Sequence, residues 1–215
     1  MTDEAVVLER VQSPRGELAL RRRGDTYEII SNGVFLMDTS DGRSERLLAQ
    51  VALANPPRRT VLIAGLGVGF TLAEVLRCAD VETVTVVEIE EDIARWNGGP
   101  LAPGNGHAVE DPRATVVVAD FVEWIEGTSQ RFDAICLDVD NGPDWTVTED
   151  NRRLYTTQHL KTLRTRLTEG GRLAIWSAAP APDFVQRLEA VVGEVQTYES
   201  PTVTGPPDLI WVVHA

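Results

Sequence analysis

A glycine-rich turn between two apolar runs limits the folds open to this chain. Residues 61–64 form a short apolar run that leads into Gly65, Gly67 and Gly69, and a helix-like segment follows. A second, β-branched run ends in Glu88, nineteen residues after Gly69. Glycines let a chain turn sharply without a Cβ clash, and an acid after the second strand can accept hydrogen bonds from both ribose hydroxyls. The pattern predicts a βαβ unit that binds an adenosine-containing molecule. A Rossmann-like fold that has lost its ligand is the alternative.

The remainder of residues 58–215 alternates between strand-like and helix-like runs, which is typical of an α/β fold. The predicted strands are residues 61–64, 83–87, 114–118, 132–137, 173–177, 194–198 and 209–214. The predicted helices are residues 70–79, 90–97, 121–126, 157–167 and a last one that begins at Pro182. The final two strands face each other across a Pro/Gly-rich loop, as in a hairpin. We therefore predict a Rossmann-like sandwich with a mostly parallel seven-stranded sheet and an antiparallel last strand.

Residues 1–57 predict a small N-terminal domain, a β-meander followed by a helix. Three short β-like runs occupy residues 17–20, 27–30 and 34–37, and a helical pattern covers residues 44–54. Gly24-Asp25 and Asn32-Gly33 between the runs favour tight hairpin turns. Asn55-Pro56-Pro57 marks the expected boundary with the Rossmann-like nucleoside-binding domain, residues 58–215.

Acidic residues follow the ends of the predicted parallel strands. Glu88 follows the second strand, Asp120 the third, and Asp138 and Asp140 the fourth. Ligands of open parallel sheets lie outside the carboxyl ends of the strands, so we expect these acids to converge with the glycine turn on one cleft. Glu88 would bind the ribose, and Asp120 would accept from the amino group of adenine. Asp138 and Asp140 would orient or deprotonate an attacking amine and hold positive charge.

Each acid also has a structural explanation. Asp is a favoured N-cap, so Asp120 could serve only to cap the helix that follows it. Asp138 and Asp140 could serve only to shape the turn after the fourth strand. Glu45 lies on a predicted helix, where a solvated side chain is the default expectation.

The composition limits the classes of partner. The formal net charge of −13 should repel phosphate backbones, so we expect no nucleic-acid partner. No apolar run is long enough to span a bilayer and no signal-like segment follows the acidic N-terminus, so we expect a cytoplasmic protein without membrane contact. Cys78 and Cys136 are expected to be free thiols, and the three histidines lack metal-ligand spacing, so no metal site is expected. The acidic surface suits a cationic substrate such as a polyamine, or serves solubility alone.

Taken together, these motifs resemble the spermidine synthase (aminopropyltransferase) family, which shares the class I S-adenosylmethionine methyltransferase fold. The matching stretches are residues 61–69, 86–90, 111–113, 119–120, 132–138, 154–155 and 167–171. The predicted meander resembles the small β domain of that family in shortened form. The resemblance implies S-adenosylmethionine or its decarboxylated form as group donor, Asp138 at the place of the catalytic acid, and a homodimer.

The chain departs from the family pattern where the amines would bind. The glycine loop of the family carries an acid that meets the aminopropyl amine, and Val68 stands at that place. The family's Tyr-His-Glu motif appears as Arg-Ser-Glu at residues 43–45, so only Glu45 is kept. Its Asp-Ser-x-Asp-Pro run becomes residues 138–143, in which the second acid is displaced or lost. These departures predict an acceptor other than putrescine.

Three functional hypotheses remain open from the sequence. The first is a spermidine synthase-like transferase that moves an aminopropyl or methyl group to an unidentified small acceptor, an amine being one candidate. The second is a small-molecule S-adenosylmethionine-dependent methyltransferase, which Val68 favours because the acid that would select an amine is missing. The third is a non-catalytic nucleoside-binding protein on a decayed enzyme scaffold.

Overall fold

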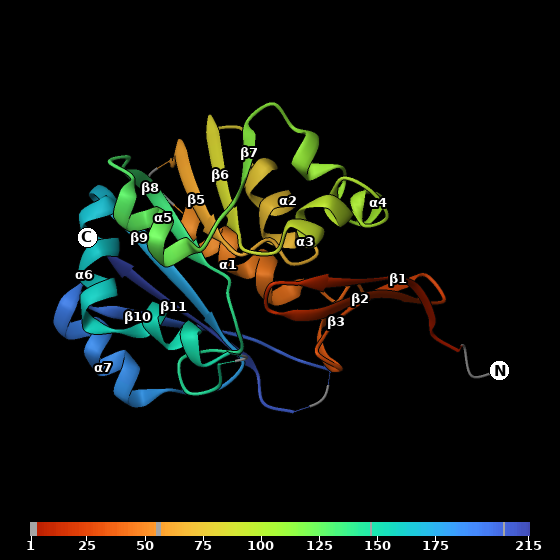
Figure 1. Ribbon diagram of the computed structural model, residues 1–215. Coiled ribbons are helices and arrows are strands. Elements are labelled where there is room, and N and C mark those ends of the chain that lie inside the picture. The colour runs from red at the N-terminus through yellow and green to blue at the C-terminus, as the bar shows by residue number, and fades with distance from the viewer. Residues whose placement is uncertain (1–3, 55–56, 147, 204) are drawn as a thin grey trace.

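The computed structural model describes residues 4–54, 57–146, 148–203 and 205–215. The first sheet of the chain is a four-stranded antiparallel meander in the order β1-β2-β3-β4, which projects from the rest of the molecule (Figure 1). Its strands are β1 (Val6–Ser13), β2 (Gly16–Arg23), β3 (Thr26–Ser31) and β4 (Val34–Asp38). Positive φ angles at Gly24, Asn32 and Gly33 form the two hairpin turns predicted from the sequence.

Strand β1 is an addition to the three strands predicted in this region. Its sequence mixes apolar and charged residues, and its register with β2 shifts between Val7 and Glu9. A strand with a shifted register lacks the strict alternation by which strands are recognised. Leu18, Leu20 and Ile29 are buried on the side of the meander that packs against the rest of the molecule.

The second sheet has seven strands in the order β10-β11-β9-β8-β5-β6-β7. The strands are β5 (Thr60–Ala64), β6 (Thr83–Glu88), β7 (Ala114–Val118), β8 (Phe132–Leu137), β9 (Leu167–Ser177), β10 (Val195–Ser200) and β11 (Asp208–His214). Strands β5 to β9 pair in parallel, whereas β11 is antiparallel to both of its neighbours. The mostly parallel sheet with an antiparallel last strand is thereby confirmed. β9 begins earlier than predicted, because Leu167 already pairs with Phe132 before the register shifts.

Helices cover both faces of this sheet (Figure 1). They are α1 (Arg43–Leu53), α2 (Phe70–Leu76), α3 (Glu91–Asn97), α4 (Ala102–Asn105), α5 (Phe121–Gly127), α6 (Thr157–Arg166) and α7 (Pro182–Val191), with the 3-10 turns η1 (Ala108–Glu110) and η2 (Glu149–Tyr155). Successive residues of β5 point to opposite faces of the sheet. Val61 and Ile63 pack in the core under α1, α2 and α3. Leu62 packs in the core under α5, α6 and α7. None of the helices in the described ranges combines the length and apolar character needed to cross a membrane.

Helix α1 packs against α2 and against β8, β9 and β11 of the larger sheet. It does so although it precedes residue 57, at which we place the domain boundary. Residues 55 and 56 of that boundary lie outside the described residues. The division into residues 1–57 and 58–215 therefore stays a prediction, and the packing of α1 places side chains of the N-terminal part against β8, β9 and β11 of the larger sheet.

Candidate active site

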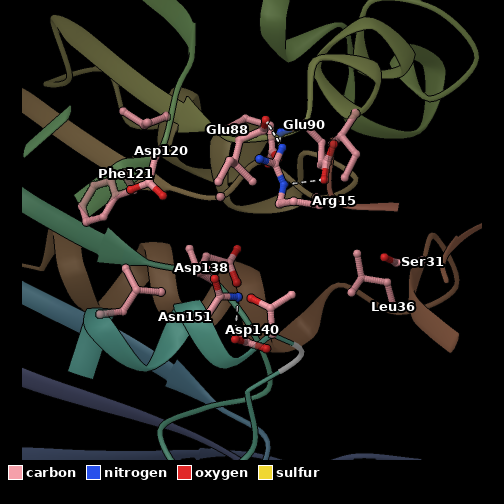
Figure 2. Close-up of a pocket in the computed structure, with 18 of the residues that line it drawn as sticks. Arg15, Ser31, Leu36, Glu88, Glu90, Asp120, Phe121, Asp138, Asp140 and Asn151 are labelled. Carbon is pink, nitrogen blue, oxygen red and sulfur yellow. Dashed lines mark hydrogen bonds and ion pairs between the residues drawn. The ribbon is translucent and has the colours of Figure 1, made fainter. Parts of the chain in front are cut away.

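A cavity of about 240 Å³ lies at the carboxyl ends of the parallel strands (Figure 2). The strand order reverses between β5 and β8, which is where ligands of open α/β sheets bind. The meander contributes a wall, including Ser31 and Leu36. The predicted site residues in the lining are Gly65, Gly67, Glu88, Asp120, Asp138 and Asp140.

The glycine turn is tightly packed at its first two glycines. Both have left-handed backbone conformations, with φ of +85° at Gly65 and +52° at Gly67. A Cβ atom on Gly65 would lie 2.2 Å from the backbone oxygen of Asp138, and one on Gly67 would lie 2.4 Å from Sδ of Met37 in β4. These glycines therefore allow close approach of two protein segments, β8 and the meander, at the rim of the cavity.

Two buried asparagines fasten the end of the glycine turn. Asn97 Nδ2 donates to the backbone oxygen of Gly67 at 2.8 Å. Asn105 Nδ2 donates to Asn97 Oδ1 at 2.7 Å and to the backbone oxygen of Val68 at 3.2 Å. Gly69 packs against this asparagine pair and lies outside the cavity lining. The side chain of Val68 is buried in the hydrophobic core and also does not line the cavity.

Glu88 ends β6 and is only 5% exposed. Its Oε2 accepts from the backbone N–H of Leu66 at 2.8 Å, and its Oε1 accepts from that of Glu90 at 2.8 Å. Burial raises the pKa of the Glu88 carboxyl, and the backbone donors of Glu90 and Leu66 oppose that shift. Glu88 thus joins the glycine turn to the end of β6.

An ion pair fastens the meander to the segment that follows Glu88. Arg15, in the turn between β1 and β2, donates through Nε to Glu90 Oε1 at 2.7 Å, and its Nη2 donates to the backbone oxygen of Ile89. Ser13 Oγ donates to the same oxygen of Glu90 at 3.3 Å. Figure 2 shows Arg15 beside Glu88 and Glu90 at one side of the cavity. Neither Arg15 nor Glu90 was predicted as a site residue from the sequence, because their contact joins residues that are distant in the chain.

Asp120 lies along the same side of the cavity as Glu88 and Glu90, with Glu88 between it and Glu90 (Figure 2). It is the N-cap of α5, and its Oδ1 accepts from the backbone N–H of Glu123 at 3.1 Å, as its structural explanation predicts. Its Oδ2 accepts from Arg153 Nη2 at 2.7 Å. The side chain therefore caps a helix, lines the cavity and holds a guanidinium at once.

Asp138, which follows β8, and Glu45 of α1 bring two carboxyl groups to the cavity. Asp138 Oδ2 accepts from Thr71 Oγ1 at 2.5 Å, and the same hydroxyl faces the backbone oxygen of Glu45 at 3.4 Å. Burial raises the pKa of Asp138 to about 6. Burial and the charge of Asp138 raise the pKa of Glu45 to about 7. The expectation of a solvated Glu45 was wrong, because α1 packs on the sheet and turns this residue into the cavity lining.

Asp140 lies below Asp138 in Figure 2, next to Asn151 of η2. Its Oδ2 accepts from Asn151 Nδ2 at 2.7 Å, and its backbone has a left-handed conformation with φ of +70°. Such a conformation is uncommon for a residue with a side chain and is best tolerated by Asn and Asp. It directs the loop after β8 back along the cavity, where Asn141 is part of the lining.

The described lining is rich in negative charge. Its acids are Glu45, Glu88, Glu90, Asp120, Asp138, Asp140 and Asp150, and its cations are Arg15 and Arg153. The two guanidiniums form ion pairs with Glu90 and Asp120. The acids that remain give the cavity a net negative charge, so it suits a cationic ligand. A carboxyl group whose pKa is raised toward neutrality can also accept a proton during a reaction.

Comparisons with known proteins agree on one family. The model of the family described as the spermine/spermidine synthase domain matches residues 42–194. A polyamine aminopropyltransferase of Corynebacterium efficiens is 30% identical over 187 residues, which cover 84% of this chain and 35% of that protein. One from Synechococcus sp. (strain JA-3-3Ab) is 33% identical over 172 residues, which cover 74% of this chain and 53% of that protein. The chain thus spans about a third to a half of the length of these relatives.

Two solved structures have the same fold. A spermidine synthase in complex with the transition state analogue AdoDATO aligns with a TM-score of 0.84 and 21% identity, over 97% of this chain and 73% of that chain. The spermidine synthase from Thermotoga maritima aligns with a TM-score of 0.82 and 21% identity, over 97% and 72% of the two chains. The Rossmann-like fold with an N-terminal meander is thereby confirmed.

Proposed function

This chain belongs to the spermine/spermidine synthase family, and from that membership we propose that it transfers an aminopropyl group from decarboxylated S-adenosylmethionine to an amine acceptor. The names of the relatives, polyamine aminopropyltransferases, support the reaction class. The observation that carries the proposal is that Glu45 and Asp138 line the same acidic cavity, where the Thr71 hydroxyl donates to Asp138 and faces the backbone oxygen of Glu45. Two adjacent carboxyl groups with raised pKa values favour a ligand that brings positive charge, as an ammonium acceptor and a sulfonium donor both would.

In the proposed reaction, the amine nitrogen attacks the methylene carbon bound to sulfur, and the carbon–sulfur bond breaks. The electron pair of that bond stays on sulfur, which leaves as the neutral thioether of 5′-methylthioadenosine. Asp138 would take the proton that the nitrogen must lose, directly or through Glu45. Holding the two reactants in line supplies much of the catalysis in such a displacement, and the acids would hold the cationic amine in place.

The donor would occupy the half of the cavity next to the glycine turn. We propose that Glu88 accepts from the ribose hydroxyls and that Asp120 accepts from the adenine amino group. The backbone at Gly65 and Gly67 would border the sulfonium and the ribose. Asp140, supported by Asn151, would hold the acceptor on the other side of Asp138. Gly69 would act only indirectly, through the shape of the turn.

A donor panel tests this proposal. The purified chain is incubated with a set of diamines and polyamines and with either decarboxylated S-adenosylmethionine or S-adenosylmethionine, and the products are separated by chromatography. We expect 5′-methylthioadenosine and a lengthened amine from the decarboxylated donor alone. Formation of S-adenosylhomocysteine from S-adenosylmethionine would instead show methyl transfer. Binding of adenosine compounds without any product would identify a non-catalytic protein.

A further inference from the structure

Both carboxylate oxygens of Asp120 already have partners. The cap of α5 uses Oδ1, which accepts from the backbone N–H of Glu123 at 3.1 Å. Oδ2 accepts from Arg153 Nη2 at 2.7 Å. The helix cap is part of the fold, so Oδ2 is the oxygen left for a ligand. A guanidinium on that oxygen neutralises the carboxylate and weakens it as an acceptor for a neutral N–H group.

The position of Arg153 is set by its own turn. Its Nε donates to the backbone oxygen of Asp150 at 3.1 Å, and its backbone oxygen accepts from Thr156 Oγ1 at 3.0 Å, next to the start of α6. The side chain reaches the cavity lining from this anchored segment. Side chains of Arg153 and Asp120 are 47% and 22% exposed, so water and salt reach the ion pair. An ion pair of this kind is weak enough for a ligand to open.

We propose that Arg153 determines donor affinity by competing with the adenine amino group for Oδ2 of Asp120. This inference rests on the proposed function, in which Asp120 faces adenine. When the nucleoside enters, the adenine amino group takes the place of the guanidinium on Oδ2, because an acceptor neutralised by Arg153 binds a neutral N–H group weakly, and the guanidinium turns toward solvent. Arg153 therefore weakens nucleoside binding, and its removal strengthens it. The effect applies to the base end of the cavity and not to the acids at Asp138 and Glu45.

The neighbouring residue supplies a matched control. Arg152 has the same side chain, but it is exposed, pairs with Glu149 at 3.4 Å and does not line the cavity. Binding of 5′-methylthioadenosine to the wild-type chain, Arg153→Met and Arg152→Met is measured by calorimetry. We expect Arg153→Met to bind about two- to fivefold tighter, which is the range for a partly exposed ion pair. Arg152→Met should bind as the wild type does. For donor turnover, KM should fall in Arg153→Met while kcat is kept.

A second nucleoside distinguishes competition for Asp120 from the extra room that Arg153→Met leaves in the cavity. 5′-Methylthioinosine has an oxygen in place of the amino group, so it has no N–H at that position to give to Asp120. Its affinity should not rise in Arg153→Met. Salt provides an independent measure, because 5′-methylthioadenosine is uncharged and added salt acts mainly on the ion pair. Its affinity should rise with salt in the wild type and stay flat in Arg153→Met.

Three results would overturn the inference while leaving the proposed function intact: unchanged binding in Arg153→Met, weaker binding, or an equal gain for the two nucleosides. Weaker binding would mean that Arg153 holds the base instead of competing with it. If neither the wild type nor any variant binds 5′-methylthioadenosine or the decarboxylated donor, the proposed function and this inference both fail.

Discussion

Arg15 and Glu90 lie 75 positions apart in the chain and form an ion pair with a 2.7 Å distance between Nε and Oε1. This contact places the β1–β2 turn of the meander directly on the segment that follows Glu88. The backbone N–H of Glu90 donates to Glu88 at the same time. Glu90 therefore connects the small sheet to Glu88.

Removal of this connection should lower both stability and nucleoside affinity. Arg15→Met leaves the Glu90 carboxylate, which is 9% exposed, without its guanidinium, and loss of a partner for a buried polar group costs about 1–3 kcal/mol. We expect a lower free energy of unfolding in urea and weaker binding of 5′-methylthioadenosine. Arg10→Met is the control, since Arg10 pairs with Glu17 on the exposed part of the same sheet. Equal effects of the two substitutions would contradict the connection.

Glu88→Ala should weaken nucleoside binding severely. The substitution removes the proposed ribose acceptor, and it also leaves the backbone N–H groups of Leu66 and Glu90 without their partner. Stability should therefore fall as well, by about 1–3 kcal/mol for each buried group left unsatisfied. Calorimetry with 5′-methylthioadenosine and urea unfolding separate the two losses. Glu91→Ala, at an exposed position of α3, should change neither. Unchanged affinity in Glu88→Ala would remove the ribose role.

Asp138→Asn should spare nucleoside binding and reduce turnover. An amide keeps the shape of the side chain but cannot accept the proton from the attacking amine, and loss of such a group lowers rates by about 10²–10⁴-fold. The measurements are kcat for the aminopropyl transfer and the affinity for 5′-methylthioadenosine. Asp144→Asn, at an exposed position of the same loop, should keep the wild-type rate. Full turnover in Asp138→Asn would make Asp138 a structural residue.

The Glu45–Asp138 pair should make stability depend on pH near neutrality. In the unfolded chain Glu45 loses its proton near pH 4.5, whereas in the folded chain it keeps the proton to about pH 7. The folded state therefore binds more protons in this range, and the free energy of unfolding falls as the pH rises from 4.5 to 7. Asp138 adds a contribution of the same sign between its usual pKa of 3.8 and about 6.

Glu45→Gln should reduce this dependence, because an amide does not titrate. Urea unfolding at pH 5, 6, 7 and 8 would give a flatter profile for the variant than for the wild type. The control, Glu149→Gln, changes an exposed carboxyl of η2 and should keep the wild-type slope. Parallel profiles for the wild type and Glu45→Gln would mean that folding does not raise the pKa of Glu45.

Gly65→Ala tests the close packing under the glycine turn. Its φ of +85° disfavours a side chain, at a cost of about 1–3 kcal/mol, and the new Cβ would lie 2.2 Å from the backbone oxygen of Asp138. We expect a large loss of stability and of nucleoside binding. Gly127→Ala at the end of α5 has no heavy atom within 4 Å of its Cβ and should be neutral or slightly stabilising. A stable Gly65→Ala protein that binds the nucleoside normally would contradict the packing.

The sequence predicted the parallel strands well, because β5, β6, β7 and β8 are short apolar runs with clear boundaries. It predicted the acids at their ends for the same reason, since topology brings strand ends together. The resemblance singled out Glu45 as the kept residue of a family motif, but the local pattern predicted a solvated side chain, because nothing local tells a helical acid on the solvent side from one that faces another layer. The sequence missed Arg15 and Arg153, because their partners Glu90 and Asp120 are brought near only by the packing of the meander and of η2.

The asparagine pair behind the glycine turn affects how fast a ligand can bind. Asn97 and Asn105 hold the carbonyl groups of Gly67 and Val68 from within the protein core. The loop therefore adopts its shape when the chain folds, and an arriving molecule does not have to order it. Encounter should then be limited by diffusion and by entry to the cavity, with little loss of affinity to loop ordering. The turn is therefore already ordered before a ligand binds, although three of its five residues are glycines.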